Sequence, residues 1–477
     1  MRSKTRHPAS VLATFAVITA TVLAACGSNT PSTSSSVAPS AAPSGDATAA
    51  PAEHEPVTIT VGALRPGVTQ EAADALFAQI DQFQAKYPWI TVEPEEYNWT
   101  APTFTAALAA GTLPDVFTIP FTDGKGLIAN TQIVDIDSRV REYGYVDKFN
   151  PNVLVNGQDE SGKVFAVPTA AYGMSLTYNR SLFTAAGLDP DAPPQTWDEV
   201  RSAAKTIADS TGVAGYAQMA IENTGGWQLT TSTYALGGRM QEVGDDGTVT
   251  STVDNPQTKA VLERVKAMRW EDSSMGATFD YGWGTMNQAF ASGQVGMFTG
   301  GSDLYTWMIQ NAALNPDDYG ITTIPLEGDA AGVLGGGTLA AVNVVTTEEE
   351  RDAAVAWIDF YYIQKLITEE GAIADAEALA ANNQPVGVPA LPIFDKATYD
   401  ESQTWIADFI NVPVAQMTPF TSKIFDQPLV NEPVAHTQET YAALDPVVQA
   451  VLTDQNADID ALLDAANAQV QAILDAD

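Results

Sequence analysis

Side chains able to carry out covalent or metal chemistry are scarce in this chain of 477 residues. It contains one cysteine and three histidines, and only His436 falls in the part whose composition predicts a packed fold. Zinc and iron sites usually need several thiolate or imidazole ligands, and a Ser–His–Asp triad would have to use His436. No Gly-x-Ser-x-Gly elbow lies near a predicted strand, and no Gly-x-x-x-x-Gly-Lys-Ser/Thr phosphate loop occurs. The sequence therefore predicts no metal, no cofactor and no enzymatic activity.

The single cysteine, Cys26, ends a pattern typical of protein export. Basic residues near the N-terminus precede an apolar stretch over 11–25, which is too short for a comfortable membrane span. This order predicts a signal peptide over residues 1–25. The run Leu23-Ala24-Ala25-Cys26 resembles the lipobox of bacterial lipoproteins, in which the chain is cut before the cysteine and the thiol is lipidated. The resemblance implies a lipid anchor on the extracellular face of the cell membrane. The alternative is a core cysteine after an ordinary signal, but Cys26 lies outside any predicted core.

The amino-acid composition limits the binding partners and the domain organisation that the rest of the chain can have. A net charge of −37 opposes binding to nucleic acid and to anionic lipid head groups. Residues 26–56 are mainly Ser, Thr, Ala and Pro after Cys26, which predicts a disordered tether. The remaining chain is long enough for two domains, and a hydrophobic content of 45% allows a large core.

Hydrophobic patterns predict alternating strands and helices after the tether. Residues 57–61 alternate as a strand does, and residues 70–86 place Leu76, Ile80 and Phe83 on one helical face. A second strand over 90–92 completes a unit expected to be parallel and right-handed. Further elements are predicted as a helix over 104–110, a strand over 115–119, capped helices after Thr196 and Thr347, strands over 296–298 and 339–344, and a last helix over 459–473.

Four sequence motifs occur in a characteristic order along the chain, and the four together identify a family more specifically than any one motif does. They are Tyr87-Pro88-Trp89-Ile90 within 83–92, Ala110-Gly111-Thr112-Leu113-Pro114-Asp115-Val116-Phe117, the long segment from Gly162 through Thr196-Trp197-Asp198-Glu199, and 290–298. Together they resemble the extracellular solute-binding proteins of ABC importers, in the carbohydrate-binding branch that includes maltose-binding protein. The resemblance spans nearly all of the chain after the tether.

This resemblance implies an α/β fold of the two-lobed, type II periplasmic-binding-protein kind, with discontinuous lobes joined by crossover strands at a hinge. The implied ranges are 57–171 plus 325–375 for lobe one, 175–320 plus 376–477 for lobe two, and crossings near 171–174, near 321–326 and within 371–389. Mobility would then be a hinge motion of the lobe pair.

The resemblance also suggests ligand-binding residues. Asp123, in a loop after the strand at 115–119, matches a hydroxyl acceptor of the family. Tyr172 lies at the first crossing, where the family often has an acidic contact. Asp303 stands where the family usually places a stacking Trp, which suggests a different sugar or orientation. Phe420 aligns loosely with a segment that supplies an aromatic ring.

Local sequence adds further candidates. A sugar needs flat aromatic surfaces for its C–H faces and fixed polar groups for its hydroxyls. Trp227 follows two glycines and Trp283 is flanked by glycines, which predicts that loops present both rings. Residues next to strands can line a cleft mouth or let backbone approach a ligand closely. The candidates of this last kind are Tyr97 with Trp99, and Gly336 with Gly337, which precede the strand at 339.

The sequence therefore predicts a monomeric, lipid-anchored receptor that captures a sugar or oligosaccharide by hinge closure and delivers it to an ABC permease. An uncharged ligand is expected because no basic residue marks the predicted cleft. One alternative is a surface glycoside hydrolase, which needs two facing carboxylates. It is not favoured because no carboxylate pair lies in a sequence context apolar enough to raise one pKa. The other alternative is a receptor for a peptide or an amine, which the acidic composition would suit.

Overall fold

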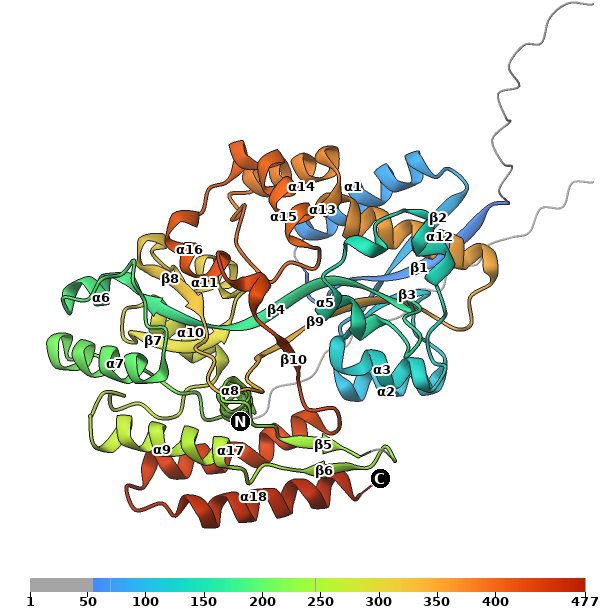
Figure 1. The fold of residues 1–477 in the computed structure, drawn as a ribbon. Helices are drawn as coiled ribbons and strands as arrows, with labels where there is room; N and C mark the ends of the chain where they lie inside the picture. The colour runs from blue at the N-terminus through green and yellow to red at the C-terminus, as the bar shows by residue number, and fades with distance from the viewer. Residues whose placement is uncertain (1–54, 69, 245, 477) are drawn as a thin grey trace, which may run out of the picture. The chain divides into compact units, whose positions relative to one another are not determined.

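The computed structural model describes residues 55–68, 70–244 and 246–476 (Figure 1). The predicted signal peptide, Cys26 and the tether as far as residue 54 lie outside the described residues. The described chain begins with β1 (Val57–Leu64), α1 (Gln70–Lys86) and β2 (Ile90–Glu96). β1 and β2 are parallel, with Val57 opposite Ile90, so the predicted strand–helix–strand unit is confirmed.

A mixed eight-stranded sheet runs through the structure in the order β2-β1-β3-β9-β4-β7, with β10 on β9 and β8 on β4. The other strands are β3 (Val116–Pro120), β4 (Ala166–Asn179), β7 (Met297–Gly301), β8 (Tyr319–Thr323), β9 (Val333–Val342) and β10 (Leu429–Asn431). β4 is the longest strand and changes partner along its length. It pairs with β9 through Gly173, and from Met174 onward it pairs with β7 and β8. One strand thus connects the two halves of the sheet.

Helices cover the sheet in groups that Figure 1 separates. Near α1 lie α12 (Glu348–Ile358), α13 (Gln364–Ile367), α14 (Glu369–Ala381) and α15 (Lys396–Trp405). Beside β1–β3 are α2 (Ala101–Ala110), α3 (Phe121–Ala129) and α5 (Pro151–Leu154), and α4 (Asp137–Glu142) contacts α12. Around β7 and β8 are α6 (Arg180–Ala185), α7 (Trp197–Thr211), α10 (Trp283–Ala291), α11 (Leu304–Ala312) and α16 (Thr418–Thr421).

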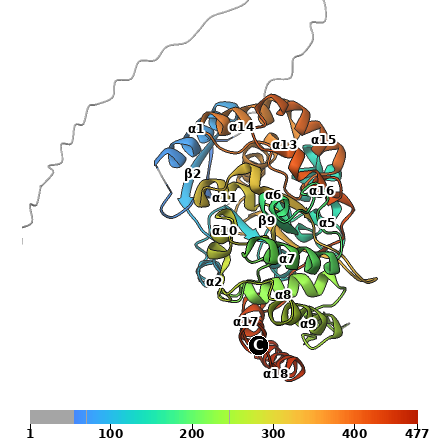
Figure 2. The same cartoon turned by 90° about the vertical axis from the view of Figure 1, so that its left-hand side faces the viewer.

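The remaining helices form a layer at the bottom of Figures 1 and 2. It contains α8 (Thr224–Ala235), α9 (Pro256–Trp270), α17 (Thr437–Thr453), α18 (Ile459–Leu474) and the hairpin of β5 (Gln241–Val243) and β6 (Val249–Ser251). Within this layer, Asp445 of α17 accepts hydrogen bonds from the backbone N–H groups of Asn223 (2.8 Å) and Gly226 (2.9 Å). The carboxylate thereby satisfies donors at the start of α8 that have no partner within the helix.

Sequence signals for helix ends were accurate where side chains cap the backbone. Thr196 and Thr347 each form the predicted capping box, with Glu199 and Glu350 as the third residues. The helix predicted to begin at residue 104 begins earlier, at Ala101, because Thr100 caps it. The first turn of a helix tolerates proline, so Pro102 does not delay the start.

One boundary error concerns the glycines before residue 339. Gly336 and Gly337 do not precede β9 but lie within it, paired with Tyr172 and Ala171 of β4. A Cβ at Gly336 would stand 2.7 Å from the Tyr172 hydroxyl, and one at Gly337 would stand 2.4 Å from the Phe121 ring. These glycines therefore make room for side chains of neighbouring elements.

The hydrophobic core consists of two clusters. One surrounds β1–β3 and α12 and also reaches α10 and α11, and the other fills the space among α7, α8, α9 and α17. None of the helices in the described ranges combines the length and apolar character needed to cross a bilayer. In the same ranges, no group of three or more His, Cys, Asp or Glu side chains is arranged to hold a metal ion.

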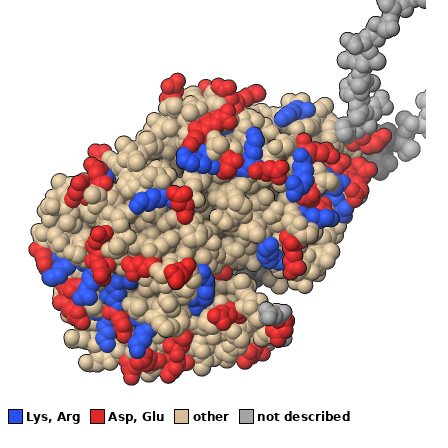
Figure 3. All heavy atoms as spheres, in the orientation of Figure 1, with Lys and Arg blue, Asp and Glu red and all other residues tan. Residues whose placement is uncertain are grey.

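Acidic side chains are distributed over the face in Figure 3 rather than gathered in one patch, and many have basic neighbours. Arg139 contacts both Glu348 and Asp352, and Arg201 contacts both Glu271 and Asp272. The Arg139 pairs, whose acidic partners are exposed, contribute little stability each. The surface offers no basic area that would attract nucleic acid on this face.

Candidate functional site

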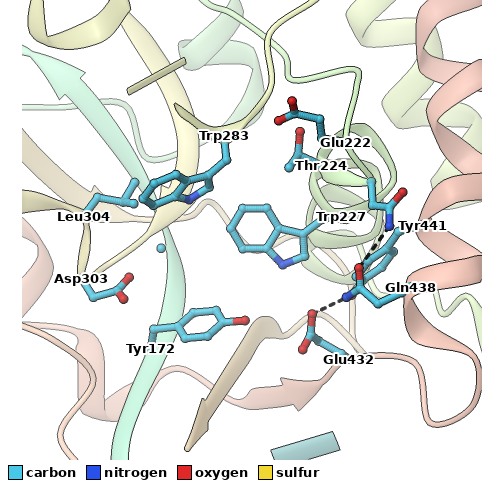
Figure 4. Close-up of a pocket in the computed structure, with 12 residues that line it drawn as sticks. Tyr172, Glu222, Thr224, Trp227, Trp283, Asp303, Leu304, Glu432, Gln438 and Tyr441 are labelled. Carbon is cyan, nitrogen blue, oxygen red and sulfur yellow. Dashed lines mark hydrogen bonds between the residues drawn. The ribbon is translucent and has the colours of Figure 1, made fainter. Parts of the chain in front are cut away.

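A cavity of about 390 Å³ lies next to the position where β4 changes partner. Its walls include Tyr172 of β4, Trp227 of α8 and Trp283 of α10 (Figure 4). Asp303 and Glu432 complete opposite sides of the polar lining. Four of the residues predicted from the sequence, Tyr172, Trp227, Trp283 and Asp303, therefore meet in one pocket although they are far apart along the chain.

The Tyr172 ring lies close to the backbone of the two strands that flank β4, namely β9 and β7. Gly336 of β9 leaves space for its hydroxyl, and a Cβ at Gly301 of β7 would stand 3.7 Å from the ring. Tyr172 meets Trp227 edge to face, with ring centroids 6.5 Å apart and an interplanar angle of 68°. The two rings form one wall of the pocket, which suits the C–H faces of a sugar.

Trp227 does not lie on the loop that its glycines suggested; it is the fourth residue of α8. The glycines serve helix packing instead. A Cβ at Gly226 would stand 2.3 Å from the Tyr441 carbonyl oxygen of α17, and one at Gly225 would stand 2.8 Å from Ala220 Cα. Together with the capping by Asp445, this close packing sets the position from which Trp227 enters the pocket.

Trp283 opens α10 rather than standing in a loop. It is only partly buried and meets Trp307 of α11 edge to face, with centroids 4.8 Å apart. Next to it, a Cβ at Gly282 would stand 2.3 Å from a carboxylate oxygen of Glu222. The glycine thereby allows the Glu222 carboxylate to lie beside the Trp283 ring at the pocket wall.

Three carboxylates line the pocket: Glu222, Asp303 and Glu432. Asp303 lies at the start of α11 and is exposed towards the open cavity; the protein atoms packed around the rest of its carboxylate remove part of its hydration, which raises its pKa. Burial also raises the pKa of Glu432, while a hydrogen bond from the Tyr441 hydroxyl (3.0 Å) to its Oε1 acts in the opposite direction. The expectation that no carboxylate pair lies in such an environment was therefore wrong, because residues distant in sequence create the environment.

Tyr172 stands between these two charges. Burial, followed by the nearby Glu432 and Asp303 carboxylates, raises its pKa well above the ordinary tyrosine value. The hydroxyl therefore stays protonated and can donate a hydrogen bond, while the carboxylates accept. Both kinds of group are needed to orient a ligand rich in hydroxyls.

Tyr97, Trp99 and Asp123 form a separate cluster outside this pocket lining. Asp123 lies in the first turn of α3, not in a loop, and accepts a hydrogen bond from Trp99 Nε1 at 2.9 Å. Burial raises its pKa, and the Trp99 bond partly opposes that rise. The Tyr97 hydroxyl donates to the Thr118 carbonyl oxygen at 2.7 Å. Gly124 is required here because a Cβ would stand 2.2 Å from the Asn156 carbonyl oxygen.

Two other predictions, Phe420 and the pair Gly336 and Gly337, do not contribute to the pocket lining. Phe420 is 1% exposed within the larger core cluster and does not line the pocket. Gly336 and Gly337 contact Tyr172 and Phe121 as described and are absent from the lining.

Several lining residues escaped sequence reasoning. Glu432 follows a three-residue strand, and Tyr441 and Gln438 belong to α17, whose pattern resembles that of any amphipathic helix. Glu222 and Asn223 have positive φ values of 61° and 66°. Asn adopts this conformation more often than most residues, but still too rarely for the sequence to predict it. The only usable signal was the Gly225-Gly226 pair, which marks close packing of the helix behind the pocket.

The fold and the site together define a protein that can hold a solute in a pocket beside the mixed sheet, where strand β4 meets helices α8, α10 and α17. The family model described as bacterial extracellular solute-binding protein matches residues 66–363, more than half of the chain. The chain therefore belongs to this family. Its fold is that of the type II periplasmic binding proteins.

Particular relatives are distant. The chain is 26% identical over 266 residues to the sn-glycerol-3-phosphate-binding periplasmic protein UgpB of Agrobacterium fabrum, covering 54% of this chain and 59% of that protein. It thus spans about three fifths of the length of the curated relatives it matches.

Solved structures match over more of the chain. The cyclic alpha-maltosyl-1,6-maltose binding protein of Arthrobacter globiformis superposes with a TM-score of 0.66 at 23% identity, covering 88% of this chain and 99% of that one. UgpB of Mycobacterium tuberculosis in complex with glycerophosphocholine gives 0.65 at 19% identity, covering 88% and 98%. At these identities the likeness establishes the fold.

Proposed function

We propose that this protein captures a sugar or short oligosaccharide outside the cell and delivers it to the permease of an ABC importer. The observation that supports this most strongly is the convergence of Tyr172, Trp227 and Trp283 with Asp303 and Glu432 on one cavity. Aromatic faces and fixed hydrogen-bonding groups are the two requirements for binding a polyhydroxylated ring. The names of several relatives, which refer to maltose derivatives and glycerol phosphates, are consistent with a ligand of this class.

In this proposal the residues have distinct roles. Trp227 and Trp283 cover apolar faces of the ligand, and Asp303 and Glu432 accept hydrogen bonds from its hydroxyls. Tyr172 stacks on the ligand or donates one hydrogen bond. Asp123, with Tyr97 and Trp99, contributes from the other lobe when the hinge closes. Ligand favours the closed form because it contacts both lobes, and only such differential contact shifts the equilibrium.

The proposed lobes are 57–171 with 325–375, and 175–320 with 376–477. The change of β4 partners after Gly173 is consistent with a crossing there. The protein is proposed to act as a monomer that Cys26 anchors to the extracellular face of the cell membrane. The permease supplies the membrane path, and a separate ATPase supplies the energy.

Calorimetry tests the proposed ligand class. The purified protein, titrated with neutral mono- and oligosaccharides, simple amines and peptides, should release or absorb heat with at least one sugar. Mass spectrometry of ligand that co-purifies with the protein should identify a compound of the same class. Heat with amines or peptides alone, and with no sugar, would contradict the proposal.

A glycoside hydrolase remains the second candidate, because burial raises the pKa of both Asp303 and Glu432 in one pocket. A general acid needs such a raised pKa. Turnover of aryl glycosides by the purified protein, abolished by Glu432→Gln or Asp303→Asn, would establish that activity. Recovery of an unchanged sugar after prolonged incubation would exclude it.

A further inference from the structure

The charge of the pocket lining is one-sided. Glu222, Asp303 and Glu432 are acidic, and among the described residues that line the cavity there is no Lys, Arg or His. Nor does any of the three carboxylates take part in an ion pair with a Lys or Arg of the described chain. Most acidic side chains of the described structure also have no Lys or Arg partner, so what sets these three apart is that they line one cavity together with aromatic rings.

Two of the carboxylates lie close against glycines, and a hydroxyl binds the third. A Cβ at Gly301 would stand 2.5 Å from an oxygen of Asp303, and a Cβ at Gly282 would stand 2.3 Å from an oxygen of Glu222. The Tyr441 hydroxyl holds Glu432 by its Oε1. Figure 4 shows the Asp303 and Glu432 carboxylates on either side of the Tyr172 hydroxyl, facing the space beside Trp227.

An aromatic wall beside unpaired carboxylates suits one kind of charged group. An ammonium group gains charge-assisted hydrogen bonds from carboxylates and is attracted to the faces of Trp and Tyr rings. An anionic group in the same place would meet like charge and find no cationic partner. A neutral hydroxyl can also donate to these carboxylates, but it brings no positive charge to offset theirs.

We propose that this pocket selects a sugar carrying an ammonium group, that is, an amino sugar, over its N-acylated or phosphorylated counterparts. This inference rests on the proposed function and narrows its ligand class. It also distinguishes this chain from relatives named for glycerol phosphates, since those names refer to an anionic ligand. The carboxylates that carry the selection are Asp303 and Glu432, with Glu222 at the edge beside Trp283.

A matched pair of disaccharides tests the inference. Chitobiose, which carries free amino groups, and N,N′-diacetylchitobiose, in which acetylation removes the charge, are titrated into the purified protein at neutral pH. Chitobiose should bind about tenfold or more tightly, as expected for a charge-assisted contact. Added salt should weaken binding of chitobiose and leave the acetylated form nearly unchanged. Glucosamine 6-phosphate should bind more weakly than glucosamine.

Variants assign the preference to named side chains. Asp303→Asn and Glu432→Gln keep the shape of each side chain but remove its charge, and each should bring the ratio of the two affinities closer to one. Glu242→Gln, on the exposed β5 strand, should keep the wild-type ratio. Circular dichroism spectra and melting temperatures verify that each variant is folded.

The outcomes separate the two proposals. Equal affinity for both disaccharides, or tighter binding of the acetylated one, overturns the amino-sugar inference and leaves the sugar-binding function standing. An amine preference that persists unchanged in both carboxylate variants also overturns it. Binding of neither disaccharide, together with no heat from any other sugar, overturns both the inference and the proposed function.

Discussion

Trp227 and Tyr172 meet edge to face in the pocket wall, with centroids 6.5 Å apart, and each exposes part of its ring to the cavity. The position of each ring depends on contacts with segments that are distant in sequence. Tyr172 rests over Gly336 of another strand, and Trp227 enters from a helix that α17 holds at its first turn. A single residue in this site therefore depends on backbone contributed by several elements.

Truncating either ring should weaken ligand binding. Trp227→Ala and Tyr172→Ala are each expected to cost about 1–3 kcal/mol of binding free energy, because each removes a stacking surface. The measurement is calorimetry with the sugar that gives the strongest heat in the panel. Trp405→Ala, at the end of α15 and outside the pocket lining, should retain the wild-type affinity. Unchanged affinity in both pocket variants would remove these rings from the site.

A buried carboxylate outside the pocket should govern stability at acidic pH. Asp359 is fully buried at the start of a π-helical turn, where burial raises its pKa from 3.8 to about 6. Its Oδ2 accepts a hydrogen bond from Gln364 Nε2 at 2.8 Å, which partly opposes that rise, as do Lys86 and the nearby Tyr145 hydroxyl. As pH rises from 3.8, the unfolded chain loses this proton before the folded chain does. The free energy of unfolding should therefore fall until about pH 6, and the penalty is complete above it.

Asp359→Asn should remove that penalty while keeping an oxygen for Gln364. At about pH 7.5 the variant should be more stable by about 1–3 kcal/mol, and its stability should vary less between the two pKa values. Urea unfolding at a series of pH values measures both effects. Asp408→Asn, at an exposed position, should keep the wild-type pH profile. If the free energy of unfolding varied with pH in the same way for wild type and Asp359→Asn, the Asp359 carboxyl would not be the cause of the pH dependence.

At the scale of elements, the packing of α8 against α17 supports the pocket. Gly226→Ala would place a Cβ 2.3 Å from the Tyr441 carbonyl oxygen, so the helices would have to separate. We expect a loss of about 1–3 kcal/mol in the free energy of unfolding, measured by urea denaturation. The matched change Gly284→Ala lies in α10 with no heavy atom within 4 Å of the new Cβ, so it should be neutral or slightly stabilising. Equal effects of the two changes would contradict this account.

Elements were also the scale at which sequence patterns worked best. Capping boxes at Thr196 and Thr347 and the apolar face of α1 are local features, and the structure confirms them. The sequence predicts a loop at glycines 225–226 and places glycines 336–337 before a strand, whereas the structure has them inside α8 and β9. A glycine that permits a turn and a glycine that permits close packing look alike until the neighbouring element is known.

At the scale of the whole molecule, attachment to the membrane is predicted to depend on one thiol. Cys26→Ser should abolish incorporation of labelled palmitate and release the protein from the membrane fraction, because the thiol is the proposed site of lipidation. Cell fractionation with immunoblotting measures the distribution. Ligand affinity should stay unchanged, since the pocket lies within the described fold. Continued membrane association of the serine variant would contradict the proposed anchor.

The sequence by itself determined the family and the fold class, the helix caps, and four side chains of the pocket, Tyr172, Trp227, Trp283 and Asp303. Those features follow from local patterns and from a resemblance that extends along the chain. Only the tertiary structure brought Glu432 and Glu222 to the same cavity, placed Phe420 in the core, and separated Asp123 from the pocket lining. The physical reason is that burial and charge environment depend on which distant segments pack together, and a one-dimensional pattern records only the neighbours along the chain.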